Sequence, residues 1–171
     1  MVCGKAALNG ALTIGTLDGA NIEILEEVGE DNIYIFGLTA DDIADRRRQG
    51  SHHPWEYYQN YPDLRRVLDA LRDGRFSPGD PNLFSWIFHS LVDHGDHYFH
   101  LADFHSYRES QALASREYQD QALWAQKAIL NVARMGRFSS DRCIKEYSRE
   151  IWGLDLSSCS LSPAKAGRAA G

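Results

Sequence analysis

The fold is decided by the run Ala11-Leu12-Thr13-Ile14-Gly15-Thr16-Leu17-Asp18-Gly19-Ala20-Asn21-Ile22-Glu23-Ile24-Leu25-Glu26-Glu27-Val28, which Asn32-Ile33-Tyr34-Ile35-Phe36-Gly37 follows closely. Residues 11–17 are apolar and β-branched, which predicts a buried strand, and Asp18-Gly19 predicts the turn that ends it. Early glutamates favour a helix over 21–28, and residues 32–37 predict a second strand. The segment 11–37 is therefore expected to be a βαβ unit with parallel strands and a right-handed crossover.

Two parallel strands make an incomplete sheet. Such strands need neighbours and cover on both faces, so we expect sheet partners that this chain does not supply. From residue 40 onward the apolar spacing predicts helices, at 41–49, 54–58, 62–71, 82–92, 104–118, 121–133 and from Ser139 or Ser140 to Trp152. The predicted fold class is thus helix-rich α/β with an incomplete parallel sheet, consisting of the βαβ unit 11–37 and a helical region at 40–153.

Three of these helices carry a predicted apolar stripe facing a core. The stripes are Leu64, Val67, Leu68 and Leu71; Leu83, Phe84, Ile87, Phe88 and Leu91; and Ile144, Tyr147, Ile151 and Trp152. Between the helices, residues 76–81 predict a loop and Tyr98-Phe99-His100-Leu101 an extended connector. Residues 155–171 are small, polar and aperiodic, which predicts a disordered tail.

Composition excludes several classes of function. The chain has 171 residues, 43% of them hydrophobic, and a formal net charge of −6. An acidic balance argues against general binding to nucleic acid or to an anionic membrane, and no run approaches the roughly 18 apolar residues that span a bilayer. Three widely spaced cysteines, Cys3, Cys143 and Cys159, indicate neither a disulfide framework nor a zinc site. A reducing, cytoplasmic setting is expected, and the oligomeric state stays open.

Several polar groups invite a catalytic or binding interpretation, and each has a simpler structural one. The glycine-bearing turn 15–21 could offer backbone N–H groups to a phosphate, but it fits a tight strand-to-helix turn better. The remaining groups are expected to be turn, cap or surface residues. They are the histidines 89, 94, 97, 100 and 105; Asp93, Asp96 and Asp103; Ser139-Ser140; and the basic cluster Arg46-Arg47-Arg48.

Lys5 is the one residue for which the surrounding sequence changes the interpretation. By residue type alone it is a surface lysine near a terminus, although a desolvated lysine can form a Schiff base. The stretch from Lys5 to Glu23, with its run Leu8-Asn9-Gly10-Ala11-Leu12-Thr13-Ile14-Gly15-Thr16-Leu17-Asp18-Gly19-Ala20-Asn21, closely resembles the α-glucan phosphorylases of glycogen, starch and maltodextrin. In that family a lysine precedes the same run by the same interval and carries pyridoxal 5'-phosphate as a Schiff base.

The resemblance extends, in order and at family spacing, over about residues 5–154. It continues through Ile35-Phe36-Gly37, Tyr57-Tyr58, Phe76-Ser77-Pro78, Asp80-Pro81-Asn82-Leu83-Phe84, Ala102-Asp103-Phe104, Phe138-Ser139-Ser140-Asp141-Arg142 and Tyr147-Ser148-Arg149-Glu150-Ile151-Trp152-Gly153. It implies that residues 1–154 are the carboxy-terminal portion of the second Rossmann-like domain of a GT-B type fold. It also implies phosphorolysis of terminal α-1,4-glucosyl units with inorganic phosphate, which yields glucose 1-phosphate.

The residues before Lys5 depart from the family pattern. The family typically has Glu-Ala-Ser-Gly-Thr-Gly-Asn-Met there, a segment that contacts glucose and phosphates, whereas this chain has Met1-Val2-Cys3-Gly4. The resemblance therefore transfers only Lys5, as the cofactor-binding residue, and no catalytic or sugar-binding residue. We expect a phosphorylase fragment that is inactive as an isolated chain. The alternative is a non-catalytic α/β-helical module that docks on another polypeptide.

Overall fold

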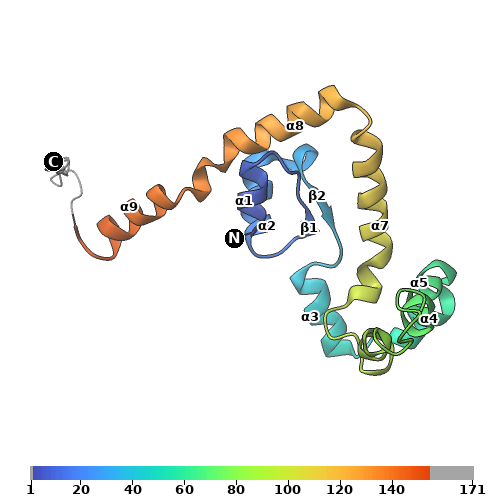
Figure 1. Cartoon of the computed structure of the whole chain (residues 1–171). Coiled ribbons are helices and arrows are strands. Elements are labelled where there is room, and N and C mark those ends of the chain that lie inside the picture. The colour runs from blue at the N-terminus through green and yellow to red at the C-terminus, as the bar shows by residue number, and fades with distance from the viewer. Residues whose placement is uncertain (1, 155–171) are drawn as a thin grey trace, which may run out of the picture. The chain divides into compact units, whose positions relative to one another are not determined.

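The computed structural model describes residues 2–154, so the tail predicted at 155–171 lies outside the described residues (Figure 1). The chain divides into two compact units, one ending at Arg134 and the other beginning at Met135. The first unit contains α1 (Val2–Leu8), β1 (Ile14–Thr16), α2 (Ala20–Val28), η1 (Glu30–Asn32), β2 (Tyr34–Phe36), α3 (Ala40–Gln49), α4 (Pro54–Asn60), α5 (Pro62–Arg72), α6 (Ser85–Phe88), η2 (His89–Asp93), α7 (His100–Glu117) and α8 (Gln121–Arg134). The second unit contains η3 (Met135–Phe138) and α9 (Ser140–Glu150).

The predicted βαβ unit is confirmed. Strands β1 and β2 pair in parallel, with Ile14 opposite Tyr34 and Thr16 opposite Phe36, and α2 connects them. Both strands are three residues long, which is shorter than the predicted 11–17 and 32–37. Within the described residues the sheet has only these two strands, so each lacks a partner along its outer edge.

Helix α8 and the end of α7 close the unit over β2. The Tyr34 hydroxyl and the Lys127 ammonium both donate to Oε2 of Glu117, over 2.7 and 2.6 Å. These hydrogen bonds lower the pKa of Glu117, whereas burial and the neighbouring carboxylate raise the pKa of Tyr34. Asn131 Nδ2 donates to the carbonyl of Asn32 over 2.9 Å. Three segments far apart in sequence are thus joined by polar contacts.

A second group of contacts fixes the start of α7, where the prediction was wrong. Residues 98–101 are not extended: Phe99 has a φ of 61° and α7 begins at His100. Asp96, which is 1% exposed, accepts hydrogen bonds from the backbone N–H groups of His100 and Leu101. It also contacts His52 Nε2 at 3.1 Å. A carboxylate that satisfies the free N–H groups of a first helical turn lets the helix start earlier than its apolar spacing suggests.

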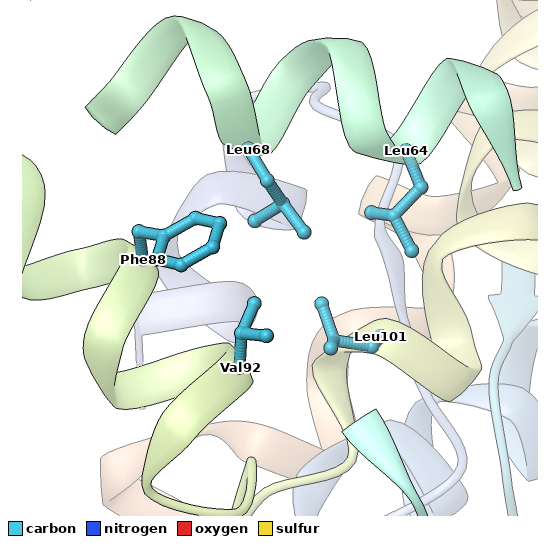
Figure 2. Close-up of a cluster of buried hydrophobic side chains, with 5 residues drawn as sticks. All are labelled: Leu64, Leu68, Phe88, Val92 and Leu101. Carbon is cyan, nitrogen blue, oxygen red and sulfur yellow. The ribbon is translucent and has the colours of Figure 1, made fainter. Parts of the chain in front are cut away.

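The helices α4 to α7 enclose a small apolar core. Figure 2 shows its five buried side chains converging from α5, from the α6–η2 segment and from α7; they are Leu64, Leu68, Phe88, Val92 and Leu101. The predicted stripe on α5 is thus correct for Leu64 and Leu68, but Val67 is 43% exposed. The predicted single helix over 82–92 is wrong. The chain turns until Ser85, and after Phe88 it continues as a π-helix, which brings Val92 into the core and leaves Leu83 half exposed.

Two further expectations differ from the structure. The helix α1 was not predicted, because seven residues near a terminus show too little apolar periodicity. In the second unit, α9 starts as predicted, with Ser139 at the N-cap position but without a side-chain cap hydrogen bond. Its predicted core stripe, Ile144, Tyr147, Ile151 and Trp152, is between 46% and 65% exposed.

Gly37 lies where β2 ends and α7 packs against it, and it allows a sharp stability prediction. Its φ is 83°, and a Cβ there would lie 2.8 Å from the carboxylate of Asp103. We expect Gly37→Ala to cost more than the roughly 1–2 kcal/mol that a left-handed φ alone imposes on a side chain. Gly29→Ala is the matched control, because Gly29 has a φ of 82° but nothing within 4 Å of a new Cβ. Equal losses in the free energy of unfolding for the two variants, measured in urea, would contradict the predicted clash.

Candidate functional site

Lys5 lies in α1, six residues before Ala11 and the segment that leads into β1. Its side chain is exposed, whereas Ala7, two residues further along the same helix, is fully buried. Its backbone carbonyl accepts a hydrogen bond from Asn9 Nδ2 over 2.8 Å. Within residues 2–154 its ammonium group has no ion-pair partner. Lys5 is therefore an accessible amine on a short helix that is anchored by its apolar side.

The surroundings of α1 test whether this chain could hold pyridoxal phosphate. A covalently held cofactor needs a free lysine amine, and Lys5 meets that requirement. A phosphate also needs cationic side chains or converging N–H groups. Helix α1 packs against α2, which has no basic residue, and against α8. The two basic residues of α8 are both engaged, Lys127 by Glu117 and Arg134 by the backbone carbonyl of Glu27. The described residues thus supply an attachment point but do not fit the phosphate of the cofactor.

The glycine-bearing turn between β1 and α2 is closed by its own hydrogen bonds. Asn21 Nδ2 donates to the carbonyl of Thr16 over 2.9 Å, and the hydroxyl of Thr16 donates to Asp18 Oδ1 over 3.2 Å. A Cβ at Gly15 would lie 2.5 Å from Asn21 Nδ2, so the glycine allows that side chain to fold over the strand. The turn therefore has the structural role expected for it, which is close packing of the strand against the helix.

A hollow of about 770 Å³ opens at the carboxyl ends of both strands. Thr16 and Asp18 contribute from the end of β1, and Phe36 and Leu38 from the end of β2. Helices α3 and α7 form the remaining walls. Asp103 of α7 holds the wall in place, because its Oδ1 accepts from the backbone N–H of Leu38 over 2.8 Å. The pKa of this carboxyl is raised, chiefly by burial. Sequence reasoning missed this hollow, because its walls come from residues about 90 positions apart.

The other polar side chains that the sequence offered as site candidates make contacts that stabilise the fold. The five histidines 89, 94, 97, 100 and 105 do not converge, and within residues 2–154 no three potential metal ligands lie together. Asp93 contacts His89, while Asp96 and Asp103 cap backbone N–H groups. In the basic cluster, Arg46 donates to the Tyr57 hydroxyl, Arg47 to the carbonyl of His97, and Arg48 pairs with Asp45. No helix in the described part of the chain is long and apolar enough to cross a bilayer.

Comparisons with known proteins give a consistent result. Residues 3–154 match the family model described as "Carbohydrate phosphorylase". A glycogen phosphorylase of Synechocystis is 51% identical over 150 residues, which are 88% of this chain and 17% of that relative. A glycogen phosphorylase of Bacillus subtilis is 48% identical over 150 residues, which are 88% of this chain and 19% of that relative. The human glycogen phosphorylase, brain form, is 43% identical over 159 residues, which are 93% of this chain and 19% of that relative. The chain thus spans less than a fifth of the length of these curated relatives.

Proposed function

Because the chain belongs to the carbohydrate phosphorylase family, we propose that it is the part of an α-1,4-glucan phosphorylase that carries the cofactor lysine, Lys5. The proposal is supported by the match over residues 3–154 and by the position of Lys5 shortly before the βαβ unit, which is where the resemblance to the family expects the cofactor lysine. The complete enzyme would transfer a terminal glucosyl unit to inorganic phosphate and release glucose 1-phosphate. Its setting would be the cytoplasm.

The incomplete sheet supports a place within a larger domain. Two three-residue strands expose N–H and C=O groups along both outer edges, and parallel sheets are normally covered and extended. We therefore propose that residues 1–154 form the carboxy-terminal portion of a Rossmann-like domain of GT-B type, whose other strands come from the remaining four fifths of the enzyme. The helical region would complete that domain.

By itself the chain would be inactive. The described residues give one accessible amine at Lys5 but no phosphate grip around it and no second domain to close a cleft. Catalysis by positioning and by electrostatic stabilisation needs those groups to be held together around the substrate. This chain's own contribution is thus to present Lys5 on α1 and to hold that helix against α2 and α8.

The alternative, a module that docks on another polypeptide, is supported by one feature of the second unit. Ile144 and Tyr147 of α9, and Ile151 and Trp152 directly after it, are exposed. Exposed apolar patches of this kind mark interaction surfaces. This reading is compatible with the first, because the polypeptide that covers α9 can be the rest of a phosphorylase.

A chimera tests the proposal. Residues 5–154 would replace the matching segment of the Synechocystis relative. We expect the chimera to release glucose 1-phosphate from glycogen and phosphate, the isolated 171-residue chain to release none, and Lys5→Ala to abolish release by the chimera. After borohydride reduction, mass spectrometry should find the cofactor on Lys5.

The matched control is Lys145→Ala, because Lys145 is an exposed lysine of α9. This variant should keep both the label and the activity. Circular dichroism identifies a chimera that fails to fold, and in that case the cofactor label can be sought in the isolated chain mixed with the truncated relative. Phosphorolysis by the isolated chain, or a chimera that works equally well without Lys5, would overturn the proposal.

A further inference from the structure

An open groove of about 300 Å³ runs along the exposed face of α5 and onto the turn that follows this helix. Its lining includes three arginines, Arg65, Arg66 and Arg75. Their guanidinium groups make no hydrogen bond or ion pair with any residue in the described range 2–154. The groove, which we call the arginine groove, therefore carries positive charge that the fold itself does not use.

The two carboxylates in the lining are engaged by other side chains. Oδ1 of Asp69 accepts from the Tyr58 hydroxyl over 2.7 Å and from Nη2 of Arg72 over 2.9 Å. Oδ1 of Asp73 accepts from Nε of Arg72 over 3.2 Å. Arg72 does not line the groove but holds both carboxylates beside it. Four arginines thus face two aspartates, and the charge left for a ligand to meet is positive.

Helix stability gives no reason for the two arginines near the start of α5. The helix begins at Pro62, so Arg65 and Arg66 are its fourth and fifth residues. Cations stabilise the opposite end of a helix, where C=O groups are free. The helical neighbour that could pair with Arg65 is Asp69, four residues further on, but Asp69 is engaged elsewhere. Both arginines are therefore available to an external anion.

The helix that carries the groove is held in place on its other sides. On the opposite face, Leu64 and Leu68 are buried in the five-residue core (Figure 2). At the end of the helix, Gly74 has a φ of 72°, and a Cβ there would lie 2.6 Å from Cα of Pro81, so the turn that carries Arg75 packs closely. The backbone positions of the arginines are thus set before a ligand arrives, which lowers the entropic cost of binding.

The length of the groove indicates an acidic polypeptide as its ligand. Arginine binds carboxylates and phosphates through its paired N–H groups. Asp73 lies seven residues after Arg66, which is about 10 Å at 1.5 Å per residue, and Arg75 lies beyond it. One phosphate group does not cover this distance. An extended peptide covers it with acidic side chains three or four residues apart, at about 3.3 Å per residue. The net charge of −6 disfavours nucleic acid.

We propose that the arginine groove docks an extended segment of a partner polypeptide that is rich in aspartate and glutamate. Arg65 and Arg66 bind the first acidic side chains of that segment, and Arg75 binds those further along. Lys5 does not line the groove, so this docking is independent of the proposed function.

Fluorescence anisotropy tests this inference, with the full 171-residue chain titrated into a fluorescein-labelled peptide, Gly-Asp-Glu-Ser-Gly-Glu-Asp-Ser-Gly. We expect saturable binding that weakens as the salt concentration rises. Arg66→Gln combined with Arg75→Gln removes two charge-assisted contacts and should weaken binding at least about tenfold. The matched control is Arg48→Gln combined with Arg149→Gln. Both of these arginines are exposed and lie outside the groove, so this variant loses the same charge but should bind as the unsubstituted chain does.

Several results would overturn the proposal. They are the absence of saturable binding, equal binding of a peptide with Asn and Gln in place of Asp and Glu, and equal binding by the two double variants. Displacement of the peptide by glucose 1-phosphate or by a single-stranded oligonucleotide, at a lower concentration than by unlabelled peptide, would instead assign the groove to a small anion or to nucleic acid. Arg75 lies outside the helix, so Arg75→Gln alone, with a severalfold loss expected, keeps the test decisive if Arg66→Gln disturbs α5.

Discussion

Leu68→Ala is expected to destabilise the first unit by about 2–5 kcal/mol. Leu68 is 2% exposed and is one of the five side chains that form the core between α5, the α6–η2 segment and α7 (Figure 2). Truncation removes its buried apolar surface and leaves a cavity that the surrounding helices fill only partly. In urea the unfolding midpoint should fall while the denaturant slope stays constant.

The neighbouring residue supplies the control for this substitution. Val67 lies on the same helix but is 43% exposed, so Val67→Ala should change the free energy of unfolding by less than about 1 kcal/mol. If Leu68→Ala and Val67→Ala lower the free energy of unfolding by similar amounts, Leu68 is not in a closely packed core. The apolar spacing of α5 predicts that Val67 and Leu68 both face the core, whereas the structure buries only Leu68. The two variants therefore distinguish between these assignments.

Asp96→Ala is the second substitution with a large expected effect: it should lower the free energy of unfolding by about 3–5 kcal/mol. The Asp96 carboxylate is buried and accepts from the N–H groups of His100 and Leu101 over 3.0 and 2.8 Å, while His52 Nε2 lies 3.1 Å away. Removing it leaves two backbone donors and a histidine, whose side chain is 8% exposed, without a partner. The first turn of α7 should then fray, with a measurable loss of helix by circular dichroism.

Asp93→Ala is the matched control for Asp96→Ala. Asp93 also contacts a histidine, His89, at 2.6 Å, but both side chains are partly exposed. Exposed ion pairs contribute about 0–1 kcal/mol, so this variant should unfold close to the unsubstituted chain. If Asp96→Ala lowers the free energy of unfolding by no more than Asp93→Ala does, the capping role of Asp96 is contradicted.

The local pattern predicted much of the fold. Apolar, β-branched residues on either side of Asp18-Gly19 indicated two strands and the helix between them, and the structure confirms their parallel pairing. Pro62 and the leucines of α5 likewise predicted a helix and its buried face. These features depend on residues a few positions apart, which is the range that periodicity and turn chemistry cover.

The errors arose where distant residues decide the structure. The early start of α7 depends on the Asp96 cap, and the carboxylate that forms this cap also contacts His52, which is 44 positions away. The π-helix after Phe88 turns Val92 toward Leu64 and Leu101, a demand of packing that helical spacing does not contain. The hollow likewise joins the ends of β1 and β2 to α7. For Lys5 the residue type gave no signal, and its proposed role as the cofactor lysine depends on the collinear resemblance alone.

The contacts made by α8 and by the last residue of α7 also determine when this unit can finish folding during synthesis. Tyr34 and Glu117 are 83 positions apart, Asn32 and Asn131 are 99 apart, and Glu27 and Arg134 are 107 apart. Contacts between residues so far apart in the sequence close long loops. The entropic cost of closing a loop must be met before its contacts can stabilise the chain. The ribosome must therefore deliver nearly the entire first unit before the βαβ unit gains the polar contacts that α8 and the end of α7 provide. Until then the nascent βαβ unit lacks these contacts, and its unpaired strand edges are open to a chaperone or a neighbouring chain.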